Sequence, residues 1–280
     1  MQLNLFQRDS IEVGQGYQSL ARFDFAEARF HFSRALVLFP GNVAAQRGLE
    51  ETVFWEGSLR EADGQAPEAA LIFLWEQLAV FLSVNSVSSG HHRDLRHSLL
   101  RYLLSLLARV SDGDRWYQPP DLCRGYLHLQ LGDNTAAERH LRILLDHLPE
   151  NGRLRRYLGD SLWRQGRPRQ DVARAEYAAA LLLAPHDVEA ETIPVPHLEA
   201  IITEHGPALA PVYGFFAGIL PLVELPCSPV GTEARACEWL RQAELARSLG
   251  HHQSMVVARR ALKDMAPEIL ADYLAWLADL

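Results

Sequence analysis

Apolar residues recur at helical spacing over most of the chain. Leucines at positions 95, 99, 103 and 106 lie on one helical face, which predicts a long amphipathic helix there. A shorter helix is expected over Pro196–Gly206, and three helices over 232–249, 251–265 and 267–280. The last has an apolar stripe that ends at Leu280. We expect it to cap the end of the fold, with a dimerisation helix as the alternative.

Composition favours helices over strands. The 280 residues include 80 Ala and Leu but only 24 Val and Ile. Small and straight-chain apolar residues lose little freedom in a helix, whereas β-branched ones suit strands. Buried parallel strands also need runs rich in Val and Ile. We therefore predict an all-α fold rather than a sandwich, a barrel or a doubly wound sheet.

A spacing of small residues repeats along the chain. A second glycine comes seven positions after the first, and an alanine comes five positions after the second glycine. An aromatic residue or leucine comes four positions after the alanine. The sets are Gly57, Gly64, Ala69, Phe73 and Gly125, Gly132, Ala137, Leu141. A related set has Phe23 in place of the second glycine, namely Gly16, Phe23, Ala28, Phe32. Another has two extra residues, namely Gly159, Gly166, Ala173, Tyr177.

This spacing predicts helix hairpins. The first glycine lets two helices approach closely, and the second ends the first helix where a left-handed conformation is needed. Alanine and the following aromatic or leucine share one face of the second helix. At these residues the chain resembles the tetratricopeptide repeat (TPR) family. The resemblance implies a solenoid, a right-handed superhelix of stacked hairpins. The clear copies are 9–42, 118–151 and 152–187, with a degenerate copy at 50–83 and a weak one at 233–267.

Composition shifts divide the predicted solenoid into five segments that we expect to form one continuous body. They are N-terminal hairpins at 1–83, a loop and long amphipathic helix at 84–117, and a central pair of hairpins at 118–187. An irregular, proline-rich insert follows at 188–230, and a degenerate hairpin with a capping helix at 231–280.

The charge is unevenly distributed. The net charge is −8, but residues 151–174 carry seven arginines and a local +5, which leaves −13 for the rest. The stretch 187–204 has a local −5. An acidic chain is a poor candidate for general nucleic-acid binding. RNA binding by a helical repeat also needs basic residues in every unit, whereas these arginines concentrate in one.

In the TPR family the first helix of each hairpin lines a concave surface. The resemblance therefore implies a set of inward-facing, partner-binding residues: Tyr17, Leu20, Phe54, Leu122, Tyr126, Leu129, Arg153, Arg156, Asp160, Trp163 and Arg164. The implied groove is apolar and aromatic at one end and arginine-rich at the other. Arginine pairs with carboxylates and aromatic rings give rigid contact area, so we expect a peptide or helix with acidic and apolar residues. Two alternatives stay open: the acidic stretch 187–204 folds back onto the arginines, or Trp163 belongs to the core.

These observations predict a non-catalytic adaptor that binds another protein. The alternative is an enzyme or small-molecule sensor that uses the insert, 185–229, as a pocket wall near His197, Glu199 and Tyr213. The C-terminal helix also allows a homo-oligomer. We expect no nucleotide cofactor, because a phosphate-binding glycine loop is missing. We assign no catalytic residues, because a Ser–His–Asp or Cys–His arrangement cannot be argued from residue spacing.

Metal binding, disulfides and membrane insertion are also not expected. Neighbouring histidines such as His91 and His92 lack a completing ligand, so we interpret them as solvated loop residues. Three widely spaced cysteines do not form a disulfide framework. The N-terminal residues do not resemble a signal peptide, and the most apolar stretch is too short to span a membrane. We therefore expect a cytoplasmic location as the default.

Overall fold

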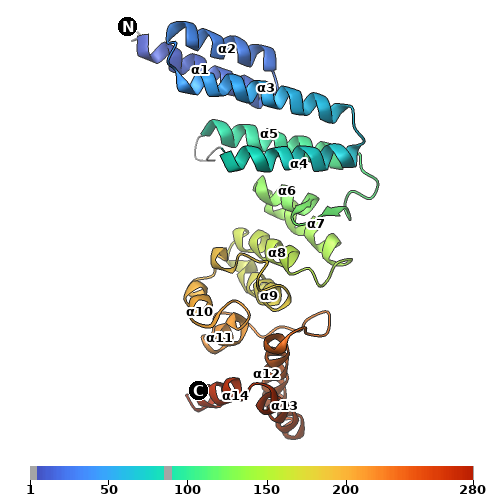
Figure 1. The fold of residues 1–280 in the computed structure, drawn as a ribbon. Helices are drawn as coiled ribbons and strands as arrows, with labels where there is room; N and C mark the ends of the chain where they lie inside the picture. Colours follow the sequence, from blue (N-terminus) through green and yellow to red (C-terminus); the bar gives the residue numbers. More distant parts are fainter. Residues whose placement is uncertain (1–4, 85–89, 280) are drawn as a thin grey trace. The chain divides into compact units, whose positions relative to one another are not determined.

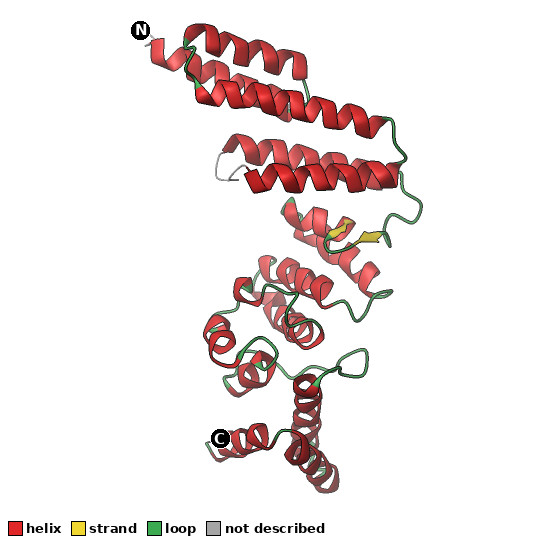
Figure 2. Ribbon diagram, viewed as in Figure 1, coloured by secondary structure: helices red, strands yellow, loops and turns green. Residues whose placement is uncertain are grey.

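The computed structural model describes residues 5–84 and 90–279 and confirms the all-α prediction. The described residues form fourteen α-helices, one 3-10 helix and two strands of two residues each (Figure 2). The chain divides into two compact units, Met1–Gln118 and Pro119–Leu280. Each unit has its own core, and each is described by itself.

The N-terminal unit contains five helices. They are α1 (Leu5–Ala21), α2 (Phe25–Leu38), α3 (Val43–Asp63), α4 (Pro67–Val84) and α5 (Gly90–Leu107), followed by strand β1 (Tyr117–Gln118) (Figure 1). The side chains of Asp24 and Asn42 cap α2 and α3, because each accepts a hydrogen bond from a backbone N–H of the first turn. The long helix predicted around 95–106 is α5, and it packs against α1 and α4. The loop expected at the start of the segment 84–117 lies mostly outside the described residues, which resume at Gly90 in α5.

The C-terminal unit starts with strand β2 (Leu122–Cys123) and two hairpins. The hairpins are α6 (Arg124–Gln130) with α7 (Asn134–Leu145), and α8 (Gly152–Arg164) with α9 (Arg167–Leu183). The insert contains the 3-10 helix η1 (Ala190–Thr192), α10 (Leu198–His205) and α11 (Ala210–Phe216). The closing helices are α12 (Thr232–Ser248), α13 (His252–Met265) and α14 (Pro267–Ala278). The four helices predicted in the insert and at the C-terminal end are all present, with ends shifted by at most two residues.

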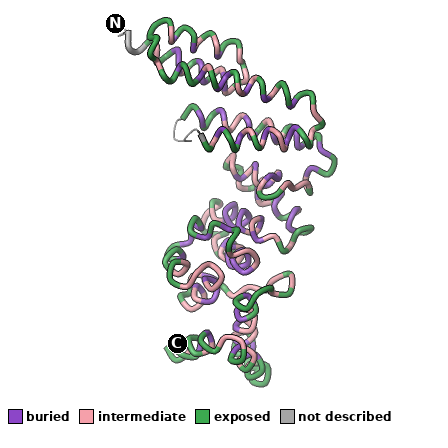
Figure 3. Tube along the Cα trace, viewed as in Figure 1, coloured by how far each residue is buried: buried purple, intermediate pink, exposed green. Residues whose placement is uncertain are grey.

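Close contact at the first glycine is confirmed in the three clear copies. A Cβ on Gly16 would lie 2.6 Å from the Phe32 ring, and one on Gly125 would lie 2.5 Å from Leu141. In the third clear copy, 152–187, a Cβ on Gly159 would lie 2.6 Å from the Tyr177 ring. Phe32, Leu141 and Tyr177 are fully buried. Buried positions accordingly lie along the facing sides of the paired helices (Figure 3).

The pattern predicted at 50–83 is wrong in detail. Gly57 is exposed, and a Cβ there would meet nothing within 4 Å. In α4, Ala70 and Leu74 are buried, one position after the expected Ala69 and Phe73, which are not. The α3–α4 pair therefore packs without a glycine contact at this position.

The second glycine has the expected left-handed conformation in two hairpins. Gly132 has φ 80° after α6, and Gly166 has φ 96° before α9. In the first hairpin Phe23 occupies this position and has φ 60°, although it carries a side chain. Gly64 differs, with φ −84°.

The C-terminal helices form a core with part of the insert. Leu240 of α12, Leu262 of α13 and Tyr273 of α14 are fully buried in one cluster that includes Val212 of α11. Helix α14 therefore covers α12 and α13 through Tyr273. On the same helix Leu274 is 45% exposed. Over the described residues, the search for a helix with the length and hydropathy of a membrane span finds none.

Candidate functional site

Helix α8 presents the predicted arginine-rich face. The side chain of Asn151 caps the helix by accepting a hydrogen bond from the Leu154 N–H at 3.0 Å. Residues 153, 156, 160, 163 and 164 recur at helical spacing, so they lie on one face. Helix α6 packs beside α8 in the same unit. The candidate site is this α6–α8 face.

Asp121 organises one end of the α6–α8 face. Its Oδ1 atom accepts a hydrogen bond from Nη1 of Arg153 at 3.0 Å and another from the Tyr157 hydroxyl. Burial, followed by the bond to Asp121, raises the pKa of Tyr157, so this hydroxyl stays protonated as a donor. The Tyr157 ring lies 4.5 Å from the ring of Tyr126 on α6. The aromatic and charged side chains are thus held together by packing and hydrogen bonds.

Arg156 is held in the middle of the face and is 9% exposed. Its Nε lies 3.5 Å from Oδ2 of Asp160, and its Nη1 lies 3.5 Å from Oε2 of Glu189. Its Nη2 donates a hydrogen bond to the Thr192 hydroxyl. The Tyr177 hydroxyl donates to Asp160 at 2.9 Å, and burial raises the pKa of Asp160.

The acidic insert therefore folds back onto one arginine. Among the described residues, Glu189 is the one acid of the stretch 187–204 that forms an ion pair with an arginine of 151–174. The arginines Arg155, Arg169 and Arg174 pair instead with Glu176, Glu138 and Asp171. Most of the local positive charge is thus compensated within the C-terminal unit.

Arg164 and Trp163 remain accessible at the other end of the face. Arg164 is exposed, and its Nη1 donates to the Leu129 carbonyl of α6 at 3.3 Å. Trp163 is half-buried, with its ring 6.5 Å from that of Tyr177. Tryptophan and arginine are among the residue types that contribute most to the energy of protein interfaces.

Four predicted groove residues lie in the core instead. Leu20 and Leu122 are fully buried, and Leu129 and Tyr17 are 1% and 6% exposed. Tyr17 is covered because α5 packs on α1 and stacks the His91 ring 4.9 Å from the Tyr17 ring. These four side chains therefore offer little surface to a partner.

The repeat pattern implied that Leu122 lies on a helix, and this is wrong. It lies in β2, and α6 begins only at Arg124. Proline lacks a backbone N–H and disfavours helical conformation in the residue before it, so Pro119 and Pro120 delay the helix. The Sγ atom of Cys123 then caps α6 by accepting from the Tyr126 N–H at 3.4 Å.

Phe54 is half-buried against the rings of Trp55 and Phe81. Together with Tyr17 and Leu20 it belongs to the N-terminal unit, whereas the other eight predicted residues belong to the C-terminal unit. The structure brings together Tyr126, Arg153, Arg156, Asp160 and Arg164 along α6 and α8.

A buried pair of titratable residues in the N-terminal unit escaped sequence reasoning. His92 is 6% exposed and is not a solvated loop residue. Its Nε2 lies 3.1 Å from Oε1 of Glu51, which is also buried. Glu51 precedes the fully buried Trp55 by one helical turn, and this spacing was the available signal that it faces inward.

The alternative site around the insert does not gather its predicted groups. His197 and Glu199 are exposed, while the Tyr213 hydroxyl donates to Asp272 at 2.9 Å. Insert residues Phe215, Ile219 and Leu220 do line a cavity of about 390 Å³ beside Trp276. His197, Glu199 and Tyr213 do not line that cavity.

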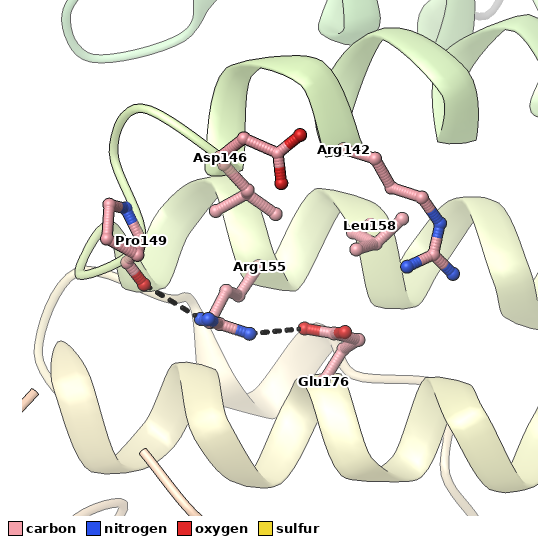
Figure 4. A pocket seen from close by; sticks show the side chains of 7 residues that line it. Arg142, Asp146, Pro149, Arg155, Leu158 and Glu176 are labelled. Carbon is pink, nitrogen blue, oxygen red and sulfur yellow. Dashed lines mark hydrogen bonds and ion pairs between the residues drawn. The ribbon is translucent and has the colours of Figure 1, made fainter. Parts of the chain in front are cut away.

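A second cavity, of about 500 Å³, lies among α7, α8 and α9 (Figure 4). Its residues are Arg142, Leu145, Asp146, Pro149, Arg155, Leu158 and Glu176. Over the described part of the chain, no three His, Cys, Asp or Glu side chains gather as a metal site requires.

Comparison of the chain with protein-family models, with curated proteins and with solved structures finds no match.

Proposed function

We propose that this chain is a TPR-like α-solenoid adaptor that binds a partner protein through the α6–α8 face, without catalysis. The observation that carries the proposal is the α6–α8 face itself, where Tyr126 and the partly exposed Arg153 lie at one end and Arg164 and the half-buried Trp163 at the other. The solenoid part of the proposal rests on three hairpins with a glycine beneath a fully buried side chain. Hairpins of this kind bury a continuous core when they stack.

The partner segment is expected to combine carboxylates with an apolar or aromatic residue. Arg164 is exposed, and the Arg153 side chain is 26% exposed despite its pairing with Asp121. Arginine binds carboxylates with paired hydrogen bonds, and the half-buried Trp163 and Tyr126 give apolar contact area. Arg156 takes no part in this contact, because Asp160, Glu189 and Thr192 already hold it.

The proposed location is the cytoplasm. The three cysteines are free, and burial raises the pKa of Cys123 and of Cys237 to about 12. Buried, unpaired thiols are typical of proteins in a reducing compartment.

Affinity capture with the purified full chain tests the proposal. A Trp163→Ala/Arg164→Glu variant should lose a partner that the unchanged chain enriches, by about tenfold or more, since interface Trp and Arg residues often contribute 2 kcal/mol or more. Arg260→Glu is the matched control, because Arg260 is exposed on α13, away from α6 and α8. Circular dichroism verifies that each variant is folded. Equal enrichment of every captured protein by all three chains would contradict the proposal.

A further inference from the structure

The cavity among α7, α8 and α9 has the size of a small-molecule site. Its volume is about 500 Å³, and binding sites for small ligands span roughly 300–1,000 Å³. It is formed by different residues from the α6–α8 face, so a ligand in this cavity does not depend on the proposed adaptor function. Two arginines, two carboxylates and three apolar residues line it.

Arg155 is held by two hydrogen bonds, Arg142 is an exposed residue that pairs with Glu138 of its own helix, and both keep donors to spare. Nε of Arg155 donates to the Pro149 carbonyl at 3.0 Å, and Nη1 donates to Glu176 at 2.9 Å (Figure 4). Nε and Nη2 of Arg142 each lie 3.0 Å from Oε1 of Glu138. A guanidinium has five N–H donors. Nη2 of Arg155 and Nη1 of Arg142 therefore stay without a partner among the described residues.

The guanidinium of Arg155 is well suited to bind a carboxylate. Arg155 is only 17% exposed at its side chain, so it has already lost most of its rotational freedom on folding. Binding groups that are ordered in advance lose less entropy when an anion arrives. Paired N–H donors also match the two oxygens of a carboxylate.

Asp146 supplies the opposite charge at the same cavity. It follows the last residue of α7, where the helix dipole is negative and a cation is favoured. Its carboxylate is exposed and forms no ion pair or side-chain hydrogen bond with the residues that the structure describes. Figure 4 shows it on the cavity wall, at the end of the helix that carries Arg142.

A simple anion would be repelled by Asp146 and Glu176, and a simple cation by the two arginines. A molecule with both charges matches the cavity. We propose that this cavity binds a zwitterionic α-amino acid with an apolar side chain. The carboxylate is held by Arg142 and Arg155, the ammonium group by Asp146, and the side chain by Leu145, Pro149 and Leu158.

Three probes on the full chain test this, with calorimetry and amide NMR as readouts. L-leucine carries both charges, 4-methylpentanoate lacks the ammonium group, and 3-methylbutylamine lacks the carboxylate. Leucine should bind at least about tenfold more tightly than either analogue, because each analogue loses a charge-assisted hydrogen bond. Amide signals of α7 and α8 should shift on binding.

Two variants at exposed positions separate the charges. Arg142→Gln should weaken leucine about tenfold and leave the amine unaffected, because the amine makes no bond to a guanidinium. Asp146→Asn should weaken leucine similarly and leave 4-methylpentanoate unaffected or tighter. Arg167→Gln is the control, since Arg167 is exposed but does not line the cavity. Absence of leucine binding, or equal affinity for all three probes in the unchanged chain, would overturn the proposal whether or not a variant folds.

Discussion

At the scale of single residues, the Phe32 ring fixes the distance between α1 and its neighbours. A Cβ would lie 2.6 Å from this ring on Gly16 and 2.4 Å from it on Gly48. Phe32 is fully buried, so a Cβ on Gly16 would force the ring or the surrounding helices to shift. Gly16→Ala should therefore destabilise the N-terminal unit by about 1–3 kcal/mol, the usual cost of overpacking a core. Urea unfolding followed by circular dichroism measures this change.

Gly57→Ala is the matched control for that substitution. Gly57 lies inside α3 in the same unit, and a Cβ there would meet nothing within 4 Å. Alanine is the better helix former, so this variant should gain about 0.5–1 kcal/mol. If both substitutions change the free energy of unfolding in the same direction, the contact with Phe32 does not determine the effect at Gly16.

The buried pair of Glu51 and His92 predicts a pH-dependent stability. Burial raises the pKa of Glu51, and His92 opposes this only partly. The contribution of Glu51 to stability is therefore complete below the ordinary glutamate pKa of about 4.3. It is lost as pH rises through the raised pKa of the folded state. Glu51→Gln keeps an acceptor for His92 and removes the charge.

The Glu51→Gln variant should therefore be more stable than the unchanged chain at pH 8, by about 1 kcal/mol, the ordinary contribution of one buried hydrogen-bonded group. The difference should shrink toward pH 5. Urea unfolding at the two pH values measures it. Glu50→Gln serves as the control, because Glu50 is exposed on the same helix. If Glu51→Gln lowers the free energy of unfolding by the same amount at pH 8 and at pH 5, the result would contradict this account.

Residue spacing predicted which residues meet within a hairpin, but not which face of the first helix stays open. Contacts such as that of Gly125 with Leu141 are local in sequence, so the repeat spacing predicts them. Tyr17 is covered by α5, which comes about 70 residues later in the chain, so no local pattern reports it. The partners of Arg156 likewise come from the insert, at Glu189 and Thr192.

At the scale of elements, α14 has one buried and one open side. Tyr273 is fully buried, and its hydroxyl donates to Glu244 of α12 at 2.8 Å. Leu274, the next residue, is 45% exposed. Tyr273→Ala should release α14, with a loss of about 3–5 kcal/mol as for other buried aromatic residues. Limited proteolysis should then cut the chain near Ala266 and Pro267, where α13 ends and α14 begins.

Leu274→Glu tests the other side of α14. An exposed substitution usually changes stability by less than about 0.5 kcal/mol, so the helix should stay protected from proteolysis. Sedimentation of this variant also tests the predicted alternative of a homo-oligomer. A change from dimer to monomer would show that α14 joins two copies, and equal protease sensitivity of both variants would contradict the capping role.

Helix ends were predictable where capping residues and prolines mark them, as at Pro267 for α14. The path of the insert was not. Glu189 and His197 have φ values of 23° and 64°, which non-glycine residues adopt only when their surroundings impose them. Those surroundings include the buried side chains of Val188, Ile193 and Leu198. Such contacts depend on the finished fold and not on a local period.

At the scale of the whole molecule, separate cores predict separate unfolding. Phe32 is fully buried in the unit Met1–Gln118, and Leu141 is fully buried in the unit Pro119–Leu280. Phe32→Ala should lower the stability of the first unit by about 3–5 kcal/mol, and Leu141→Ala that of the second by about 2–5 kcal/mol. If the units unfold independently, each variant shifts one urea transition and leaves the other in place.

A solenoid that is coupled through every repeat behaves differently, because each hairpin is stabilised by its neighbours and a local loss spreads along the array. Amide NMR, which reports each unit by its own signals, distinguishes the two cases. A parallel shift of both transitions in either variant would contradict independent units, whereas a shift of one transition would show that the proposed binding face on α6 and α8 belongs to a unit that is stable by itself.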